Sequence, residues 1–275
     1  MSDDPVFSGF TKETVRFFAA LRKNNNKEWF DRNRETYDRH VMAPAKLFVT
    51  AMGERLRRIA PHIVAVPKVN KSIFRINRDT RFSLDPVPYK TNLGILFWDG
   101  VRPKMESSGF YFHLEPPDLW LAAGMYMIPD PLLGRYRKAI VDPKSGAEIR
   151  KIMAAISARA GFSLGGEHYK RVPAGFDPSH PNAALLKHNG LYASSEAKIP
   201  DEFFSADLVD YCFERYEPLA PLHRWLIKLL PFFLREIDAS LGIGDVRPSR
   251  NVNRPDLFFR LEDVGRFLDS GVGNF

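Results

Sequence analysis

Apolar residues in the first fifth of the chain recur at the spacing of helices. The segment 11–23 has this pattern, and Thr11 can cap its start. Three asparagines at 24–26 interrupt the pattern, because Asn tolerates the left-handed backbone that ends helices and also caps new ones. We therefore expect further helices over about 27–41 and 43–59.

The middle of the chain has a different pattern, in which short runs rich in aromatic and β-branched residues lie between prolines and glycines. Such runs are typical of strands, and connections this short favour antiparallel pairing. The expected strands are 71–77, 92–98, 109–115 and 119–128. In the third of these, apolar side chains alternate with Tyr111, His113 and Glu115, so the three polar residues share one face.

Helical spacing returns after residue 130. We expect helices at 130–142, at 145–160, within 181–189 and, bent or broken at Pro218, Pro221 and Pro231, over 200–242. A loop rich in Gly and Pro, with room for short strands, occupies 161–182. The order of elements predicts a single α+β domain over 1–275, with an antiparallel sheet of about four or more strands in the middle of the chain, flanked by N-terminal and C-terminal helices.

Composition narrows the class of protein. The chain has 275 residues, 44% of them hydrophobic, which is ample for a core, and a net charge of +7. Its only cysteine, Cys212, excludes an intramolecular disulfide and a Cys-rich zinc site. No apolar run reaches the length of a signal peptide or a membrane span. We therefore expect a cytoplasmic protein with no membrane partner, and no motif identifies a cofactor.

The segment 74–91 concentrates charge beside apolar residues. Its cations are Arg75, Arg78, Arg81 and Lys90, and its carboxylates are Asp79 and Asp85. Strand alternation would place Arg75 on the polar face of the sheet. Guanidinium groups bind phosphate or carboxylate through paired hydrogen bonds, and two carboxylates cannot neutralise four cations, so these residues could form an anion site. Alternatively, the carboxylates pair with the arginines and hold the loop in place.

Tyr111, His113 and Glu115 form the second candidate constellation. His and Glu two positions apart on a strand could act as an acid–base pair, with Tyr111 in support. Two ligands are too few for most metal sites, although a later histidine could complete a set, and we predict no metal. The alternative is a structural His113 that is hydrogen-bonded but takes part in no chemistry.

Two further groups could contribute to an anion site. Asn33 and Arg34 could line a pocket against the polar face of the sheet; the alternative is that their helix packs Trp29 and Tyr37 into the core while Asn33 caps a neighbouring backbone group. Lys170, Arg171 and His180 could close over the site, or they could belong to an ordinary surface loop.

Four stretches together resemble the DUF2461 family of conserved hypothetical proteins. They are 24–37, 74–92, 109–116 and 169–192, and the resemblance covers about residues 7–240, leaving 241–275 as a C-terminal extension. The residues that match the family pattern are Arg75, Arg78, Asp79, Arg81, Phe82, Asp85 and Tyr89. Pro86 stands where the family has Lys, which puts in doubt any role that needs a cation there. The resemblance implies no activity, cofactor or catalytic residue.

These patterns leave three functions open. The first is an enzyme or binding protein for an anionic small molecule, either phosphorylated or carboxylated, held by the arginine cluster at a sheet edge. The second is a structural or interaction protein in which that cluster is architectural. The third, which the dispersed charge favours least, is a nucleic-acid-associated module. No nucleophile-elbow, Walker or dinucleotide-binding motif is present, and the oligomeric state stays open.

Overall fold

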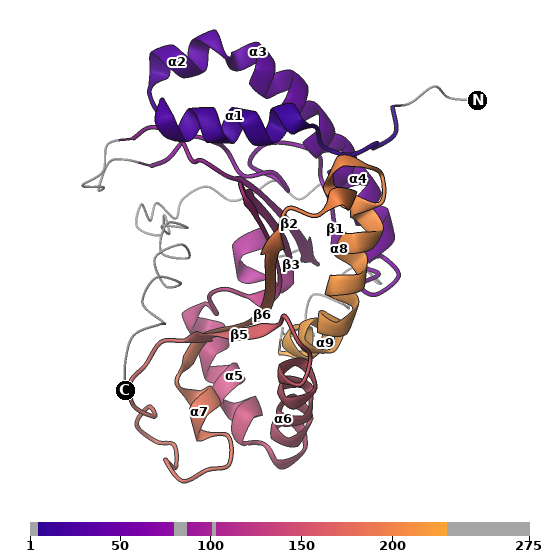
Figure 1. Ribbon diagram of the computed structural model, residues 1–275. Coiled ribbons are helices and arrows are strands. Elements are labelled where there is room, and N and C mark those ends of the chain that lie inside the picture. The colour runs from indigo at the N-terminus through magenta and orange to yellow at the C-terminus, as the bar shows by residue number, and fades with distance from the viewer. Residues whose placement is uncertain (1–4, 80–86, 101–102, 230–275) are drawn as a thin grey trace, which may run out of the picture.

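The computed structural model describes residues 5–79, 87–100 and 103–229. Its α-helices are α1 (Lys12–Lys23), α2 (Lys27–Arg32), α3 (Arg34–Tyr37), α4 (Ala43–Leu56), α5 (Asp130–Val141), α6 (Pro143–Ser157), α7 (Ala183–Leu186), α8 (Leu208–Tyr216) and α9 (Ala220–Lys228). Its strands are β1 (Ile63–Val64), β2 (Leu93–Asp99), β3 (Gly109–Glu115), β4 (Asp118–Met125), β5 (Ser163–Glu167) and β6 (His188–Lys198). Helices therefore precede and follow a central sheet, which confirms the predicted α+β class (Figure 1).

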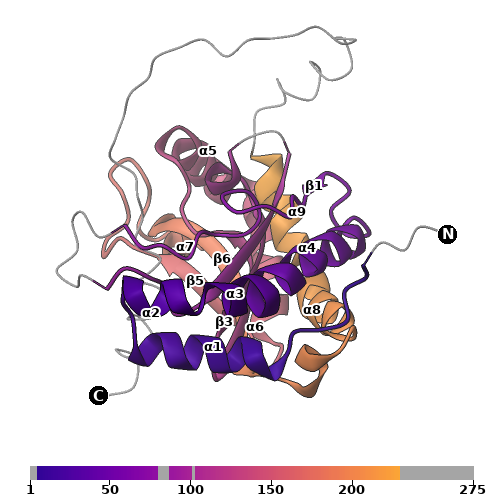
Figure 2. The same ribbon diagram turned by 90° about the horizontal axis from the view of Figure 1, so that it is seen from above.

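The N-terminal helices form a hairpin at one end of the sheet. Figure 2 shows α1 lying beside α2 and α3, and α1 contacts α3 directly. The Asn26 side chain accepts a hydrogen bond from the Trp29 amide at 2.9 Å and so caps α2. The helix expected over 27–41 is divided at Asn33, and after α3 it continues as a π-helical turn over Asp38–Met42 into α4.

The six strands form one antiparallel sheet in the order β1-β2-β3-β4-β6-β5. Three of the expected strands are confirmed as β2, β3 and β4. The first expected strand, at 71–77, was wrong: the segment makes isolated bridges, from Ile73 to Val69 and Ile95 and from Asn77 to Tyr89. The longest strand, β6, was not predicted, because much of it consists of small or polar residues that lack the aromatic and β-branched signature.

The two faces of the sheet differ in character. One face is buried and apolar in β2, β3 and β4, and its residues are Leu93, Ile95, Phe97, Phe110, Phe112, Leu114, Leu119, Leu121 and Ala123. Both α8 and α9 contact β4, and α4 packs against α8 (Figure 1). The alternate residues of the same strands point to the opposite face, which carries the site described below.

The later helices follow the predicted pattern. α5 and α6 occupy the two segments expected at 130–160, and a short 3₁₀ turn, Glu217–Leu219, joins α8 to α9 at the predicted bend near Pro218. Pro231 and the extension 241–275 lie outside the described residues. Among the helices that the structure describes, none combines the length and the apolar character needed to cross a bilayer.

Candidate functional site

Cross-strand pairing builds the second face of the sheet from alternating large and small residues. The three rows of neighbours across β2, β3, β4 and β6 are Gly94–His113–Trp120–Glu196, Leu96–Tyr111–Ala122–Ser194 and Trp98–Gly109–Gly124–Tyr192. Gly109, Ala122 and Gly124 carry little or no side chain, so the face is hollowed between the aromatic residues on either side. Strand register, which the sequence does not state, creates this hollow.

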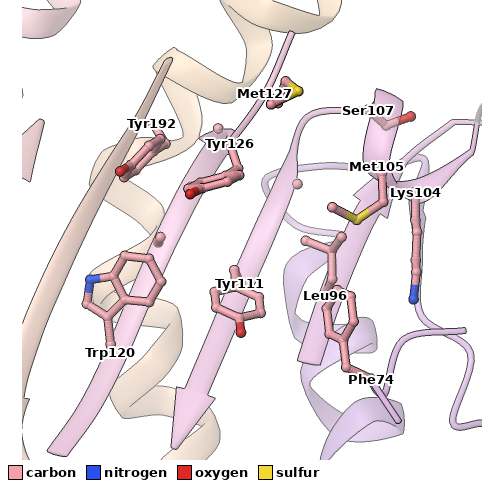
Figure 3. Close-up of a pocket in the computed structure, with 14 residues that line it drawn as sticks. Phe74, Leu96, Lys104, Met105, Ser107, Tyr111, Trp120, Tyr126, Met127 and Tyr192 are labelled. Atoms are coloured by element: carbon pink, nitrogen blue, oxygen red, sulfur yellow. The ribbon is translucent and has the colours of Figure 1, made fainter. Parts of the chain in front are cut away.

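We call this hollow the sheet pocket. Its lining residues are Phe74, Leu96, Lys104, Met105, Ser107, Gly109, Tyr111, Trp120, Ala122, Ala123, Gly124, Tyr126, Met127 and Tyr192. Figure 3 shows Trp120, Tyr126 and Tyr192 on one side of Tyr111, and Phe74, Met105 and Lys104 on the other. Aromatic and thioether side chains therefore form most of the wall, with few polar groups among them, as is typical of small-molecule sites.

Lysines gather around Phe74 at one end of the sheet pocket. The ammonium of Lys104 lies 4.1 Å from the centroid of the Phe74 ring, and that of Lys90 lies 5.8 Å from it. Lys104 also donates a hydrogen bond of 2.8 Å to the backbone oxygen of Lys71. Burial is the largest of three causes that together lower the pKa of Lys104 to about 8, and the positive charges of Lys90 and Lys71 are the other two.

A chain of hydrogen bonds runs along β3 from the pocket wall. The Tyr111 hydroxyl lies 2.9 Å from His113 Nδ1, and His113 Nε2 lies 3.5 Å from Glu115 Oε2. Asn92 Nδ2, which can only donate, lies 3.4 Å from the same Nδ1. Nδ1 is therefore the acceptor, and the Nε2 proton faces the carboxylate. We call Tyr111, His113 and Glu115 the pocket relay.

Glu115 anchors the far end of the pocket relay. Its Oε1 accepts hydrogen bonds from the Thr91 hydroxyl at 3.0 Å and from Arg22 of α1 at 3.2 Å. The hydrogen bond from His113 is the largest of the effects that hold the pKa of Glu115 below its usual value, and Thr91 and Arg22 act in the same direction. Burial, followed by the nearby Glu115 charge, raises the pKa of Tyr111. At neutral pH the phenol is thus protonated and the carboxylate is ionised.

Glycine at position 94 gives Tyr111 its space. A Cβ atom at Gly94 would lie 2.7 Å from the Tyr111 hydroxyl oxygen and 3.2 Å from the Phe74 ring. Trp120 packs edge-on against Tyr111, with ring centroids 5.6 Å apart, and against His113 at 6.0 Å. The pocket relay is therefore held in position from two neighbouring strands.

A second set of hydroxyl, imidazole and carboxylate groups lies on the buried face, where the hydroxyl is hydrogen-bonded to the imidazole but the imidazole Nε2 has no hydrogen-bond partner among the described residues. The Ser108 hydroxyl lies 2.9 Å from Nδ1 of His223 in α9, and His223 Nε2 lies 3.6 Å from Asp99 Oδ2. Neither Ser108 nor His223 is exposed, and Asp99 is only 6% exposed. We call Ser108, His223 and Asp99 the buried relay. It resembles a hydrolase triad in order, but with its serine fully buried it offers no nucleophile to a substrate.

The charged segment that the sequence singled out is held at its base by backbone pairing. The Arg78 amide donates to Pro88 O at 2.9 Å, and the Lys90 amide donates to Ile76 O at 2.8 Å. The Asn25 side chain bonds both backbone groups of Tyr89, at 2.8 and 3.0 Å. The Tyr89 ring is buried and stacks on Phe30 of α2, with the centroids 4.3 Å apart.

Arg75 and Arg78, the arginines of this segment that the structure describes, do not line the sheet pocket. Phe74, rather than Arg75, contacts the polar face of the sheet, with its ring 6.1 Å from that of Tyr111. The expected placement of Arg75 was therefore wrong, because the segment is not a regular strand; Arg75 is exposed, and Arg78 and Asp79 are half-buried. Arg81 and Asp85 lie outside the described residues.

Other predicted site residues also lie away from the sheet pocket. The Asn33 amide donates to Trp29 O at 2.8 Å, as the capping alternative predicted, and Arg34 pairs with Asp31 and lies 5.2 Å from the Phe30 ring. Lys170 and Arg171 are exposed in the loop before α7. His180 Nδ1 in that loop accepts the Asn182 amide at 3.1 Å. None of these five candidates belongs to the pocket lining.

Sequence reasoning missed the residues that complete the sheet pocket. Lys104 lies in a 3₁₀ turn, Lys104–Glu106, that has no periodic pattern, and Trp120 and Tyr192 join Tyr111 only through strand register. Within the described residues, no group of three or more His, Cys, Asp or Glu side chains is placed to hold a metal ion.

The chain matches the family model of the conserved hypothetical proteins DUF2461 over residues 13–225. It belongs to this family. The match lies within the predicted extent of the resemblance and includes the sheet pocket and all residues of both relays. A search of curated proteins finds no match. Membership of DUF2461 assigns no reaction, so the function has to be argued from the site.

Proposed function

We propose that this protein binds a small molecule that joins a flat apolar body to a carboxylate or phosphate group, and that it transfers a proton to or from the bound molecule. The observation that carries the proposal is the position of Tyr111. Tyr111 lines the sheet pocket, and its hydroxyl is hydrogen-bonded to His113. A titratable chain that ends in a concave apolar site is the usual form of an acid–base site.

The lining supports the apolar part of the ligand. Trp120, Tyr126 and Tyr192 offer aromatic surfaces, and Met105 and Met127 offer adaptable thioethers. Flat apolar ligands gain from both kinds of contact, and aromatic walls bury large areas at low entropic cost.

The lysines support the anionic part. Lys104 lines the sheet pocket, and Lys90 and Lys71 are close enough for their charges to lower its pKa. An anion bound here would relieve the mutual repulsion of the three ammonium groups, so part of its binding free energy would come from charge neutralisation. Arg75 and Arg78, in the same segment as Phe74, would add to the positive potential.

The pocket relay supports proton transfer. Tyr111 can give its proton to a developing oxyanion, and His113, once it carries a proton on both ring nitrogens, can return one from Nδ1 to the phenolate while Nε2 faces Glu115. Burial keeps the phenol protonated until such an acceptor arrives, because it raises the pKa of Tyr111. The expected role is thus general acid at Tyr111, proton carrier at His113 and electrostatic support at Glu115.

The proposal is tested by a thermal-shift screen of aromatic and aliphatic carboxylates, sugar phosphates, nucleotides and a short oligonucleotide on the wild type, Lys104→Met and Arg75→Ala. A ligand at about 100 times its dissociation constant should stabilise the protein by about 2.7 kcal/mol. We expect an aromatic carboxylate or phosphate to stabilise the wild type and to lose most of this effect with Lys104→Met, while Lys151→Met serves as the control outside the sheet pocket. Equal stabilisation of all variants, or a response to the oligonucleotide alone, would contradict the proposal.

A further inference from the structure

We propose that Lys104 captures the carbonyl carbon of an aldehyde or ketone as an imine, which makes the ligand of the sheet pocket a carbonyl compound. This inference rests on the proposed function, which it sharpens by naming the reacting group of the ligand. It stands on three observations: the position of Lys104 in the lining, the fixed orientation of its amine, and the cations around it.

The amine of Lys104 is held in place at the end of the sheet pocket. It donates one hydrogen bond of 2.8 Å to the backbone oxygen of Lys71 and lies 4.1 Å from the centroid of the Phe74 ring. In the contact with Lys71 the Lys104 amine donates an N–H group, so a neutral amine keeps its lone pair while it makes this bond. Figure 3 shows the Lys104 side chain extended beside Phe74 on the same face of the sheet as Tyr111.

The surroundings favour the neutral amine, which is the nucleophile. Burial against Phe74 and the charges of Lys90 and Lys71 bring the pKa of Lys104 to about 8. Desolvation and a neighbouring cation are the two ways in which proteins activate a lysine for attack on a carbonyl group. The same neighbouring cations would draw in a carbonyl compound that also carries a carboxylate or phosphate.

The chemistry balances without a cofactor or an oxidant. The nitrogen lone pair attacks the carbonyl carbon, and the C–N bond forms as the carbonyl π electrons move to oxygen. The oxygen takes one proton from water, and the nitrogen releases one, which gives a carbinolamine. The hydroxyl group then takes a second proton and leaves as water, and the nitrogen releases its second proton as the C=N bond forms. The net change is condensation of one amine with one carbonyl group to give one imine and one water.

Reductive trapping tests this inference on the full chain. The protein is incubated at pH 8 with phenylpyruvate or with benzaldehyde, in the presence of cyanoborohydride, which delivers hydride to the imine carbon. Peptide mass spectrometry then gives the extent of labelling at each lysine. At pH 8 an amine of pKa 8 is half neutral, whereas an ordinary lysine is neutral in only about 0.3% of molecules. We expect Lys104 to be labelled at least about tenfold faster than exposed lysines such as Lys151, with a half-maximal rate near pH 8.

Two variants make the result specific. Lys104→Arg keeps the charge but cannot form an imine, so the preferred label should disappear, whereas Lys151→Arg should leave it unchanged. Labelling of Lys104 at the same rate as Lys151 with both carbonyl probes would overturn the inference. Binding of phenylpyruvate without cyanoborohydride, measured by isothermal titration on the wild type, separates the two proposals. Binding without preferred labelling sinks only the imine, whereas neither binding nor labelling sinks the imine and the proposed ligand class together.

Discussion

The pocket relay and the buried relay contain the same groups in the same order but lie on opposite faces of the sheet. Each has a hydroxyl 2.9 Å from an imidazole Nδ1. In each, the carboxylate lies farther from Nε2, at 3.5 Å in the pocket relay and 3.6 Å in the buried relay. The difference is exposure: the side chain of His113 is 19% exposed, whereas that of His223 is not exposed at all.

This difference shows that a hydroxyl–imidazole–carboxylate chain is not by itself an active site. The buried relay fixes α9 against the ends of β2 and β3, and its polar groups depend on one another because water cannot replace a lost partner. The pocket relay borders a hollow that a ligand can enter. Stability should therefore depend mainly on the buried relay, and binding and chemistry on the pocket relay.

Removal of the buried imidazole should have the largest effect. His223→Ala leaves a cavity against Phe110, deprives the Ser108 hydroxyl of its hydrogen-bond partner and removes the imidazole beside Asp99, so the free energy of unfolding should fall by about 3 kcal/mol. His113→Ala should cost about 1 kcal/mol or less, because water can reach the groups that it leaves. Urea unfolding of both variants at pH 7 measures the two losses. Equal losses would break the proposed division between the relays.

A methyl group at position 94 should have the next largest effect. Gly94→Ala would force the Tyr111 hydroxyl and the Phe74 ring apart, which we expect to cost about 1–2 kcal/mol and to weaken ligand binding in the sheet pocket. Gly134 in α5 is the matched control, because a Cβ there meets nothing within 4 Å. Gly134→Ala should raise the free energy of unfolding by up to about 1 kcal/mol, since Ala favours helix, and leave binding unchanged. Thermal unfolding, with and without a ligand from the screen, distinguishes the two.

Lys104 of the sheet pocket should make the free energy of unfolding depend on pH in the alkaline range. The pKa of Lys104 is about 8 in the folded protein and 10.5 ordinarily, so between these values the unfolded chain binds more protons and the free energy of unfolding rises with pH. Between pH 8 and 10.5 the free energy of unfolding of the wild type should rise by about 1 kcal/mol relative to that of Lys104→Met. This value is reduced because the amine is partly exposed. Urea unfolding across this range measures the gain, and a constant difference between the two proteins would contradict the lowered pKa.

The carboxylate of the pocket relay should give the smallest effect, on the acid side. The pKa of Glu115 is lowered in the folded protein, so its contribution is present above the ordinary glutamate pKa and is lost as the pH falls through the folded value. At pH 7 the free energy of unfolding of the wild type should exceed that of Glu115→Gln by a few tenths of a kcal/mol. The difference is small because the side chain is 41% exposed. This excess should disappear in the same urea assay as the pH falls through the lowered pKa of Glu115; an excess that grows on acidification would have the wrong sign.

The local sequence pattern was sufficient to predict part of the fold and of the candidate site. Alternation along 109–115 placed Tyr111, His113 and Glu115 on one face, and the structure brings them into hydrogen-bonding distance. Several helix limits were also predicted from caps and prolines, because these signals act through neighbouring residues in the sequence. The family match over 13–225 also agreed with the motifs that suggested it.

Other features depend on long-range pairing and could not be predicted in this way. The sheet pocket exists because Ala122 and Gly124 fall beside Tyr111 and Gly109 in register, and because β6 brings Tyr192 to the same face. The pairing of Ser108 with His223 spans 115 residues. The segment 71–77 has the composition of a strand but makes only bridges, since it lies beside β2 for a short distance before the charged stretch begins.

The pocket relay, and not the buried relay, is expected to serve a ligand. Isothermal titration of the ligand found by the screen into wild type, Tyr111→Phe and Ser108→Ala tests it most directly, because each variant removes one hydroxyl from one relay. We expect Tyr111→Phe to raise the dissociation constant about tenfold, because one well-placed hydrogen bond is lost. Folded Ser108→Ala should bind like the wild type. Unchanged binding to Tyr111→Phe, or weakened binding to Ser108→Ala alone, would contradict it.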